Sequence, residues 1–433
     1  MQTGGIKREF FGNAAFSLFC ALIIGIFAYL VRRTTANGLP GNEYAFFYSI
    51  FSLINIAIPI VSLGISNATF FALPDFRNQG MEEEARGAYA FCLRWVLVTG
   101  GALALVVFPL LLRLGNNIER YGIEDRNIFF FLLLIPLPLY ISATMIHILN
   151  GLKLFFLSNS LLILNIASVL AGVFLFQKQY GLRALSVSYA AAALCVSGIG
   201  IWVCRKKYGY SITHPVSAAV RNRLLKTGIW LFLSGTGYYC FTELGNVILY
   251  YVGTPEDTMK FNIAMPVAVI IRSLSVVSRI FAPYSNELSH RHEYRSLRYV
   301  VLSVLAITLV MAACAWPFFS TFGKTLLVLL FGQRFVSASS SMLLLIICVF
   351  FWNAAYFFND MLNSMHHEHI SAVLSLASAI LGGILYFVFS LKYGAEGAAL
   401  GALITSVVWM VFSFFMILFL IGRMSKQDQS PPE

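Results

Sequence analysis

The stretch KYGAEGAALGAL (392–403) leads a chain rich in Phe, Leu and Ile through a short polar turn into glycine and alanine. A looser version, QYGLRALSVSYAAA, occupies 179–192. We interpret the Tyr-Gly pair as a tight reversal between two neighbouring helices, because Gly394 and Gly397 can take backbone angles that a Cβ forbids. The small side chains that follow would let the next helix approach its neighbour closely.

The composition indicates that these helices lie in a bilayer. Hydrophobic residues make up 59% of the 433 residues and charged residues only 11%, and the mean hydropathy is +0.78. Soluble domains carry about 25% charged residues, so this chain lacks the polar groups to cover a surface in water. The net charge of +11 is therefore not interpreted as a nucleic-acid signature, and no nucleic acid is expected as a partner.

Hydropathy predicts twelve membrane-spanning helices, because runs of about 20 apolar residues suffice to cross the hydrocarbon. TLLVLLFG (325–332) is apolar but short and is predicted as a surface or re-entrant piece. The predicted spans are 10–31, 44–72, 88–112, 127–149, 154–176, 182–204, 226–252, 262–284, 297–319, 336–361, 368–391 and 395–421.

The two Tyr-Gly turns belong to a longer internal repeat. A shift of 213 residues aligns the two turns and also places polar residues on identical ones, without a gap: Tyr180 on Tyr393, Gly181 on Gly394, Asn150 on Asn363 and Ser158 on Ser371. Six spans return the chain to its starting side, so the halves form a parallel repeat about an axis along the membrane normal. The fold class is therefore an all-α polytopic membrane protein with two six-helix bundles.

The predicted organisation places a bundle at 1–204, a basic cytoplasmic linker at 205–226, a second bundle at 227–421 and a disordered cytoplasmic tail at 422–433. The cluster CRKKYGY (204–210) supports a cytoplasmic linker, because Lys and Arg accumulate on the inner side. Both termini are then cytoplasmic. All seven cysteines fall in or at the end of apolar spans, where small core side chains are expected.

Arginines inside the predicted spans are candidate binding residues, because a charged side chain near mid-bilayer costs at least about 2.5–3.5 kcal/mol. Arg272 lies near the middle of the eighth span, and Arg279 follows seven residues later on the same helical face. Arg94 lies in the third span, and Arg32 closes the first. A guanidinium offers forked donors that match phosphate oxygens. Snorkelling and structural ion pairs are the alternatives for these arginines.

Two acidic residues are candidates for ion coupling or for an ion pair. Glu243 lies in the seventh span at a depth similar to that of Arg272 in the eighth, so adjacent antiparallel helices could pair them. Asp360 lies near the cytoplasmic end of the tenth span, and the repeat aligns it with His147. Glu243 could form a static bridge or carry a coupling proton. HHEH (366–369) is interpreted as a solvated turn, so no metal site is predicted.

Four segments make the chain resemble the polysaccharide-transport flippases of the multidrug/oligosaccharidyl-lipid/polysaccharide (MOP) exporter superfamily, which move O-antigen-type lipid-linked oligosaccharides. The resemblance implies a V-shaped pair of bundles around a central cavity. The segments are GLPGNEYAFFYSIFSLINIAIPIVSLGISNA (38–68), RLLKTGIWLFLSGTGYYCFTELGNVILYYVG (223–253), LLVLLFGQRFVSASSSMLLLI (326–346) and KYGAEGAALGALIT (392–405).

The resemblance implies that the protein moves a polyprenyl-pyrophosphate-linked oligosaccharide to the outer leaflet of the bacterial cytoplasmic (inner) membrane by alternating access. Its partners would be this lipid, membrane lipids, a polysaccharide polymerase and glycosyltransferases, and we expect a monomer. No cofactor is expected, and a proton or sodium gradient could drive transport.

Two other functions compete with this hypothesis. A drug or cation antiporter of the same superfamily should carry buried acids, often in the first helix, whereas 10–31 contains none. A membrane polysaccharide polymerase or ligase should carry a large outer loop, and the longest one predicted here, 113–126, is too short to hold a domain. The protein is therefore expected not to be an enzyme.

Overall fold

The computed structural model describes residues 3–113, 119–123, 127–273, 288, 293–365 and 367–429. The chain divides into two compact units, Met1–Phe47 with Ile54–Phe232 and Tyr48–Leu53 with Leu233–Glu433. The boundary thus falls inside one helix, α8, and a short piece of α2 clusters with the second unit. Every element within the described residues is helical.

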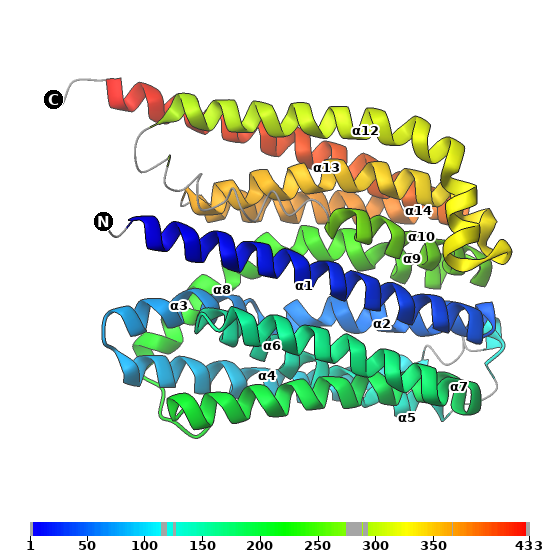
Figure 1. Cartoon of the computed structure of the whole chain (residues 1–433), viewed down its shortest axis with the longest axis horizontal. Helices are drawn as coiled ribbons and strands as arrows, with labels where there is room; N and C mark the ends of the chain where they lie inside the picture. The colour runs from blue at the N-terminus through cyan, green and yellow to red at the C-terminus, as the bar shows by residue number, and fades with distance from the viewer. Residues whose placement is uncertain are drawn as a thin grey trace. The chain divides into compact units, whose positions relative to one another are not determined.

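The first unit contains helices that pack chiefly around α6 and α7 (Figure 1). Their bounds are α1 (Thr3–Gly38), α2 (Gly41–Ser62), α3 (Ile65–Asn78), α4 (Glu82–Arg113), the 3₁₀ turn η2 (Glu119–Tyr121), α5 (Ile128–Leu133), α6 (Pro136–Gly151), α7 (Phe155–Tyr208) and the first part of α8 (Ala218–Tyr239).

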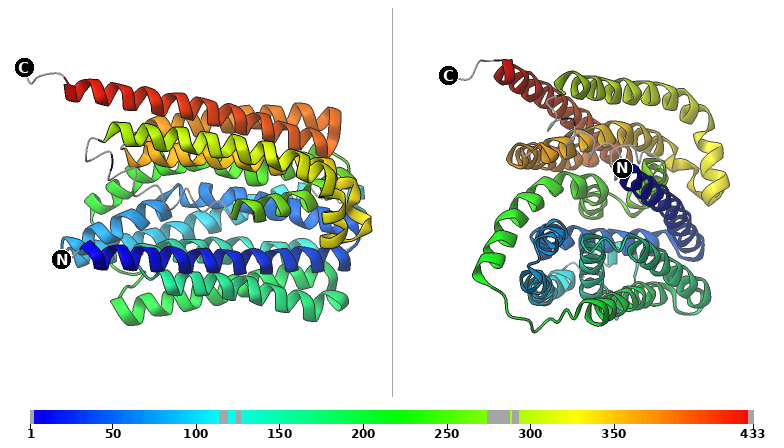
Figure 2. Two further views of the ribbon diagram at one scale, coloured as in Figure 1. Left: turned by 45° about the horizontal axis from the view of Figure 1, so that its top comes forward. Right: turned by 60° about the vertical axis from the view of Figure 1, so that its left-hand side comes forward.

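The second unit is built on the packing of α13 against α14, with α10 and α12 beside them (Figure 2). Its elements are the end of α8, the π-helical turn η3 (Cys240–Leu244), α9 (Gly245–Val252), α10 (Pro255–Ser273), α12 (Tyr294–Phe331), the 3₁₀ turn η4 (Gln333–Ala338), α13 (Ser339–Ser364) and α14 (Glu368–Gln429).

Eight helices within the described ranges are long and apolar enough to cross a membrane. Two of them, α7 and α14, are each two helices joined at a glycine, with φ 52° and ψ −128° at Gly181 and φ 55° and ψ −130° at Gly394. The near-identical torsions confirm the predicted reversals and the equivalence of the two turns, since only glycine tolerates this region.

Gly397 has a different role from the one predicted. Its φ is not positive. Instead, a Cβ on Gly397 would lie 2.0 Å from the carbonyl oxygen of Phe389, and one on Gly401 would lie 3.1 Å from the main chain of Leu385. The small residues after the turn therefore allow the two limbs of α14 to approach, as expected for helices packed in lipid.

The predicted span 44–72 is interrupted, which is a correction. Helix α2 ends at Ser62, Leu63 and Gly64 take left-handed angles (φ 44° and 68°), and α3 follows. A Cβ on Gly64 would lie 2.1 Å from the carbonyl oxygen of Gly228. The first part of α8 thus crosses the break at backbone contact, and this packing fixes the interruption.

Two further boundary predictions were wrong. The segment 325–332 is not a separate piece, because α12 continues to Phe331. The predicted disordered tail at 422–433 is helical as far as Gln429, since its Lys and Gln residues are good helix formers. Within the predicted linker 205–226, α7 extends to Tyr208 and α8 begins at Ala218, so the non-helical part is 209–217.

Polar contacts hold the loop 209–217 on the first unit. Arg94 Nη2 donates to the carbonyl oxygen of His214 over 2.8 Å, and His214 Nε2 lies 2.9 Å from Glu83 Oε2. Arg223, just beyond the loop, lies 2.7 Å from Asp75 Oδ2. Tyr210 is buried against the rings of Tyr89 and Tyr208. The loop is therefore tied to the α3–α4 region.

Candidate functional site

The π-helical turn η3 interrupts the α-helical geometry between α8 and α9, and it contains Glu243. The turn fits because the facing helix is small here: a Cβ on Gly382 would lie 2.8 Å from Cys240 Sγ. Cys240 Sγ also lies 3.5 Å from the carbonyl oxygen of Ala379. π turns inside α-helices are frequent at functional sites. Glu243 is half-buried in this turn.

A column of aromatic rings packs beside this turn. The ring of Trp352 lies parallel to that of Tyr356 at 5.2 Å and to that of Phe241 at 5.0 Å. Tyr238 contacts both members of the α13 pair, at 5.7 Å from Trp352 and 6.3 Å from Tyr356. Trp352 is fully buried, whereas Tyr238 and Tyr356 are partly exposed. The members of the column that a ligand could reach are therefore the two tyrosines and not the tryptophan.

Asp360 continues the same face of α13, four residues after Tyr356 and eight after Trp352. The register of α13 against α8 pairs Phe241 with Trp352 and Ser234 with Asn359. Asp360 is therefore level with Ser234, nine residues before Glu243, which corresponds to about 13 Å along the helix. The two half-buried carboxylates thus lie at different depths, and the aromatic column fills the interval between them.

A buried amide and hydroxyl cluster lies at the Asp360 level. Ser234 Oγ lies 2.9 Å from Ser371 Oγ, and it accepts from Asn359 Nδ2 (3.3 Å) and Asn363 Nδ2 (3.2 Å). Within the described part of the chain, Oδ1 of Asn359, Oδ1 of Asn363 and the hydroxyl of Ser375 accept or donate no hydrogen bond. Buried polar groups thus gather at this level of the second unit.

The first unit carries the repeat-related version of this cluster. Asn150 and Ser158 are aligned with Asn363 and Ser371, and Ser158 Oγ donates to Asn150 Oδ1. In the second unit, Ser234 bridges the corresponding pair. The same two residue types thus take part in the cluster of each repeat, bonded directly in the first unit and through one additional hydroxyl in the second.

The predicted arginines are distributed over both units. Arg94 is exposed and donates to Ala90 and His214, and Arg32 is half-buried near the end of α1. Arg272 lies in α10, but its side chain is outside the described residues, as is the whole of Arg279. The pairing of Arg272 with Glu243 therefore stays a prediction.

The aromatic column is a feature that the sequence did not reveal, because Tyr238, Trp352 and Tyr356 were not among the candidate residues. The signal was the i, i+4, i+8 spacing that ends in Asp360. Within the described residues, no group of three or more His, Cys, Asp and Glu side chains could hold a metal ion.

No family model matches the chain. The chain is 21% identical over 411 residues to the uncharacterized membrane protein MJ1068 of Methanocaldococcus jannaschii, covering 90% of this chain and 80% of that protein. The relative supports a membrane protein.

Solved structures with a similar fold are transporters. An inward-facing multidrug resistance MATE family transporter of the MOP superfamily matches with a TM-score of 0.76 at 14% identity, covering 95% of this chain and 99% of that one. The outward-facing conformation matches with a TM-score of 0.67 at 15% identity, covering 95% and 96%. A MATE structure in complex with MaL6 matches with a TM-score of 0.66 at 14% identity, covering 95% and 97%. This all-helical membrane protein therefore has the two-bundle fold of the MATE transporters of the MOP superfamily.

Proposed function

We propose that the protein is an alternating-access flippase that moves a polyprenyl-pyrophosphate-linked oligosaccharide from the cytoplasmic to the outer leaflet. Alternating access is supported by the fold, which has been solved in inward-facing and outward-facing conformations in other proteins. The sequence segments that resemble polysaccharide-transport flippases support the cargo.

The aromatic column is the observation that carries the proposal. Phenols and ring faces at Tyr238 and Tyr356 combine flat apolar surface with hydrogen-bonding tips, which is the chemistry that small-molecule sites use to hold hydroxyl-rich rings. We propose that these residues contact the glycan and that Arg272, Arg279, Arg94 and Arg32 attract its pyrophosphate or acidic sugars.

Glu243 and Asp360 are proposed to couple transport to a proton or sodium gradient. A carboxylate within a spanning helix is costly unless a cation or a partner neutralises it. The two acids lie about 13 Å apart along the helices. We therefore propose that they act as two stations, with Glu243 in the π turn as the primary one.

A drug or cation antiporter is the second candidate, and one arrangement favours it. An acid at each end of an aromatic column is suited to an organic cation, because aromatic faces and carboxylates both attract positive charge. The multidrug transporters of similar fold agree with this candidate equally well.

The test separates the two cargoes in a host whose surface glycan depends on the protein. Arg272→Ala should abolish glycan export at normal protein level, and Arg272→Lys should restore it partly, because an ammonium lacks forked donors. Lys392→Ala, an exposed charge stacked on Tyr393, is the control. A normal amount of surface glycan in the Arg272→Ala strain, together with new sensitivity to drugs, would refute the flippase proposal and favour the antiporter.

A second arm tests the coupling residues by ion-driven uptake into vesicles. Glu243→Gln should be as severe as Arg272→Ala if Glu243 carries the coupling ion, and milder if it only orients Arg272. Asp360→Asn should shift the dependence on proton or sodium concentration. Unchanged ion dependence in both variants would refute the two-station proposal without bearing on the cargo.

A further inference from the structure

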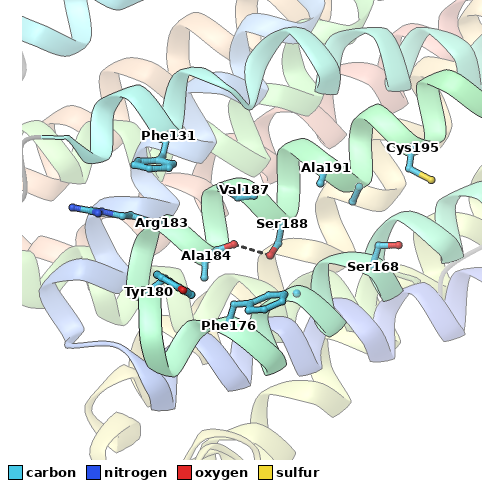
Figure 3. A pocket seen from close by; sticks show the side chains of 12 residues that line it. Phe131, Ser168, Phe176, Tyr180, Arg183, Ala184, Val187, Ser188, Ala191 and Cys195 are labelled. Atoms are coloured by element: carbon cyan, nitrogen blue, oxygen red, sulfur yellow. Dashed lines mark hydrogen bonds between the residues drawn. The ribbon is translucent and has the colours of Figure 1, made fainter.

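An open groove of about 640 Å³ runs between the two limbs of α7 in the first unit (Figure 3). Phe131 of α5 covers it at one end, close to the Gly181 reversal. Ser168 and Cys195 line it at the other end, one from each limb. The groove does not include any residue assigned to the proposed transport function.

The floor of the groove is made of small residues. A Cβ on Gly172 would lie 2.2 Å from Ser188 Oγ, so the limbs touch there. The Ser188 hydroxyl donates to the carbonyl oxygen of Ala184 over 2.6 Å and is thereby satisfied within its own helix. Ala191 is exposed in the trough. The surface available to a ligand is consequently apolar along most of its length.

A positive charge lines the end of the groove beside the helix reversal. Arg183 lies two residues past Gly181, is exposed, and holds its guanidinium 5.5 Å from the centre of the Phe131 ring. The rings of Tyr180 and Phe176 lie on the opposite limb at the same end (Figure 3). A helix reversal in a membrane protein lies at the headgroup level, where Arg and Tyr are favoured.

The length of the groove corresponds to one leaflet. Twelve residues separate Arg183 from Cys195, which is about 18 Å along a helix, and half of the hydrocarbon core is about 15 Å thick. The large apolar side chains outside it are exposed, including Phe174 (74%), Leu175 (67%) and Leu194 (57%). Such a surface on spanning helices faces lipid chains.

We propose that this groove binds one chain of an anionic phospholipid, with the lipid phosphate held by Arg183. The cationic end, the apolar trough and the one-leaflet length complement the three parts of such a lipid. A guanidinium gives charge-assisted donors to phosphate oxygens, whereas a protein helix or a soluble anion would leave either the charge or the trough unmatched. The site is independent of the cargo of the transporter.

Native mass spectrometry of the detergent-purified protein, titrated with dioleoyl phosphatidylglycerol, tests the site. Arg183→Gln should weaken binding about tenfold, the effect of losing one charge-assisted contact. Ala191→Trp, which fills the trough, should weaken it at least as much. The controls are Lys178→Gln, an exposed charge beside the same turn, and Leu194→Trp, an exposed apolar residue outside the trough.

Phosphatidylcholine and a polyprenyl phosphate complete the experiment. We expect phosphatidylcholine to bind more weakly than phosphatidylglycerol in the natural protein and equally in Arg183→Gln. If Arg183→Gln loses binding and Ala191→Trp does not, the lipid contacts the protein through its headgroup alone. That result would refute the proposal that a lipid chain lies in the groove. Displacement of phosphatidylglycerol by polyprenyl phosphate at a lower concentration would assign the groove to the isoprenoid chain and overturn the phospholipid proposal.

Discussion

At the scale of single residues, the two glycine reversals form a natural matched pair. Gly181 and Gly394 share torsions that L-residues avoid, at a cost of about 1–3 kcal/mol for any side chain. Only Gly394 is also crowded: a Cβ there would lie 2.3 Å from Asp257 Oδ1, which accepts from the amide of Ala395. Nothing lies within 4 Å of a Cβ on Gly181.

We therefore expect Gly394→Ala to lower the thermal unfolding midpoint more than Gly181→Ala. The first substitution adds a clash with Asp257 to the backbone strain that both share. Adding Asp257→Ala should recover part of the difference, although Asp257 also caps α10 through Thr254. Thermal unfolding in detergent measures all of these midpoints, and equal losses in the two glycine variants would refute the crowding at Gly394.

Tyr210 is a buried phenol whose hydroxyl lacks a hydrogen-bond partner within the described residues. Burial raises the pKa of Tyr210 to about 12, and nearby Glu82 acts in the same direction. A phenol with a raised pKa stabilises the folded state fully below its unfolded pKa of about 10. That contribution is lost as pH rises toward 12.

Tyr210→Phe should therefore leave stability at neutral pH unchanged or slightly higher, since no hydrogen bond is broken. Between about pH 10 and 12, the variant should lose less stability than the natural protein. Unfolding midpoints across this range provide the measurement, and Tyr208→Phe, a partly exposed neighbour, is the control. A large loss at neutral pH would indicate that the hydroxyl has an essential partner.

At the scale of helices, the polar cluster around Ser234 joins α8, α13 and α14 of the second unit. Ser234→Ala removes the acceptor of Asn359 and Asn363 at once. Unsatisfied buried donors cost about 1–3 kcal/mol each. We expect a marked fall in the unfolding midpoint for this variant.

Ser378→Ala is the matched control, because this buried hydroxyl donates only to Ser375 of its own helix. Its midpoint should fall less. A similar fall in the two variants would mean that the cluster adds nothing beyond the burial of a serine.

The π turn and the aromatic column also belong to this scale. Tyr238 and Glu243 are five residues apart, the spacing that a π turn brings into line. Helix α13 supplies Trp352, Tyr356 and Asp360 from one face. A π turn and a regular α-helix thus contribute to the same face of the second unit. Without the π turn, a continuous α8–α9 helix would rotate Glu243 by about 100° from its present direction, which is the rotation of one residue at 3.6 residues per turn.

At the scale of the whole molecule, the prediction concerns which ends face the cytoplasm. Single cysteines at Glu256 and Ser211, both exposed, should behave oppositely in a background in which the exposed Cys195 and Cys314 are replaced by serine. An impermeant maleimide should label Glu256→Cys in intact cells and Ser211→Cys only after permeabilisation. Labelling of Ser211→Cys in intact cells would reverse the orientation.

The sequence by itself determined the solvent, the helical class and the repeat. Few charges and long apolar runs show that the chain folds in a bilayer, and Tyr-Gly pairs 213 residues apart mark the two reversals at Gly181 and Gly394. Glu243 and Asp360 could be identified as candidates because a charge among apolar residues is conspicuous. These features can be recognised in the order of the residues, without knowing which helices contact one another.

The tertiary structure alone decided where close approaches occur. The break at Gly64 depends on Gly228 from a distant helix, and the π turn fits against Gly382. The aromatic column could not be recognised in the sequence, because aromatic residues make up 15% of the chain. Hydropathy gives the same value to an aromatic residue in the column and to one that faces lipid. Packing partners distant in sequence set these features, and no local pattern encodes the register in which two helices meet.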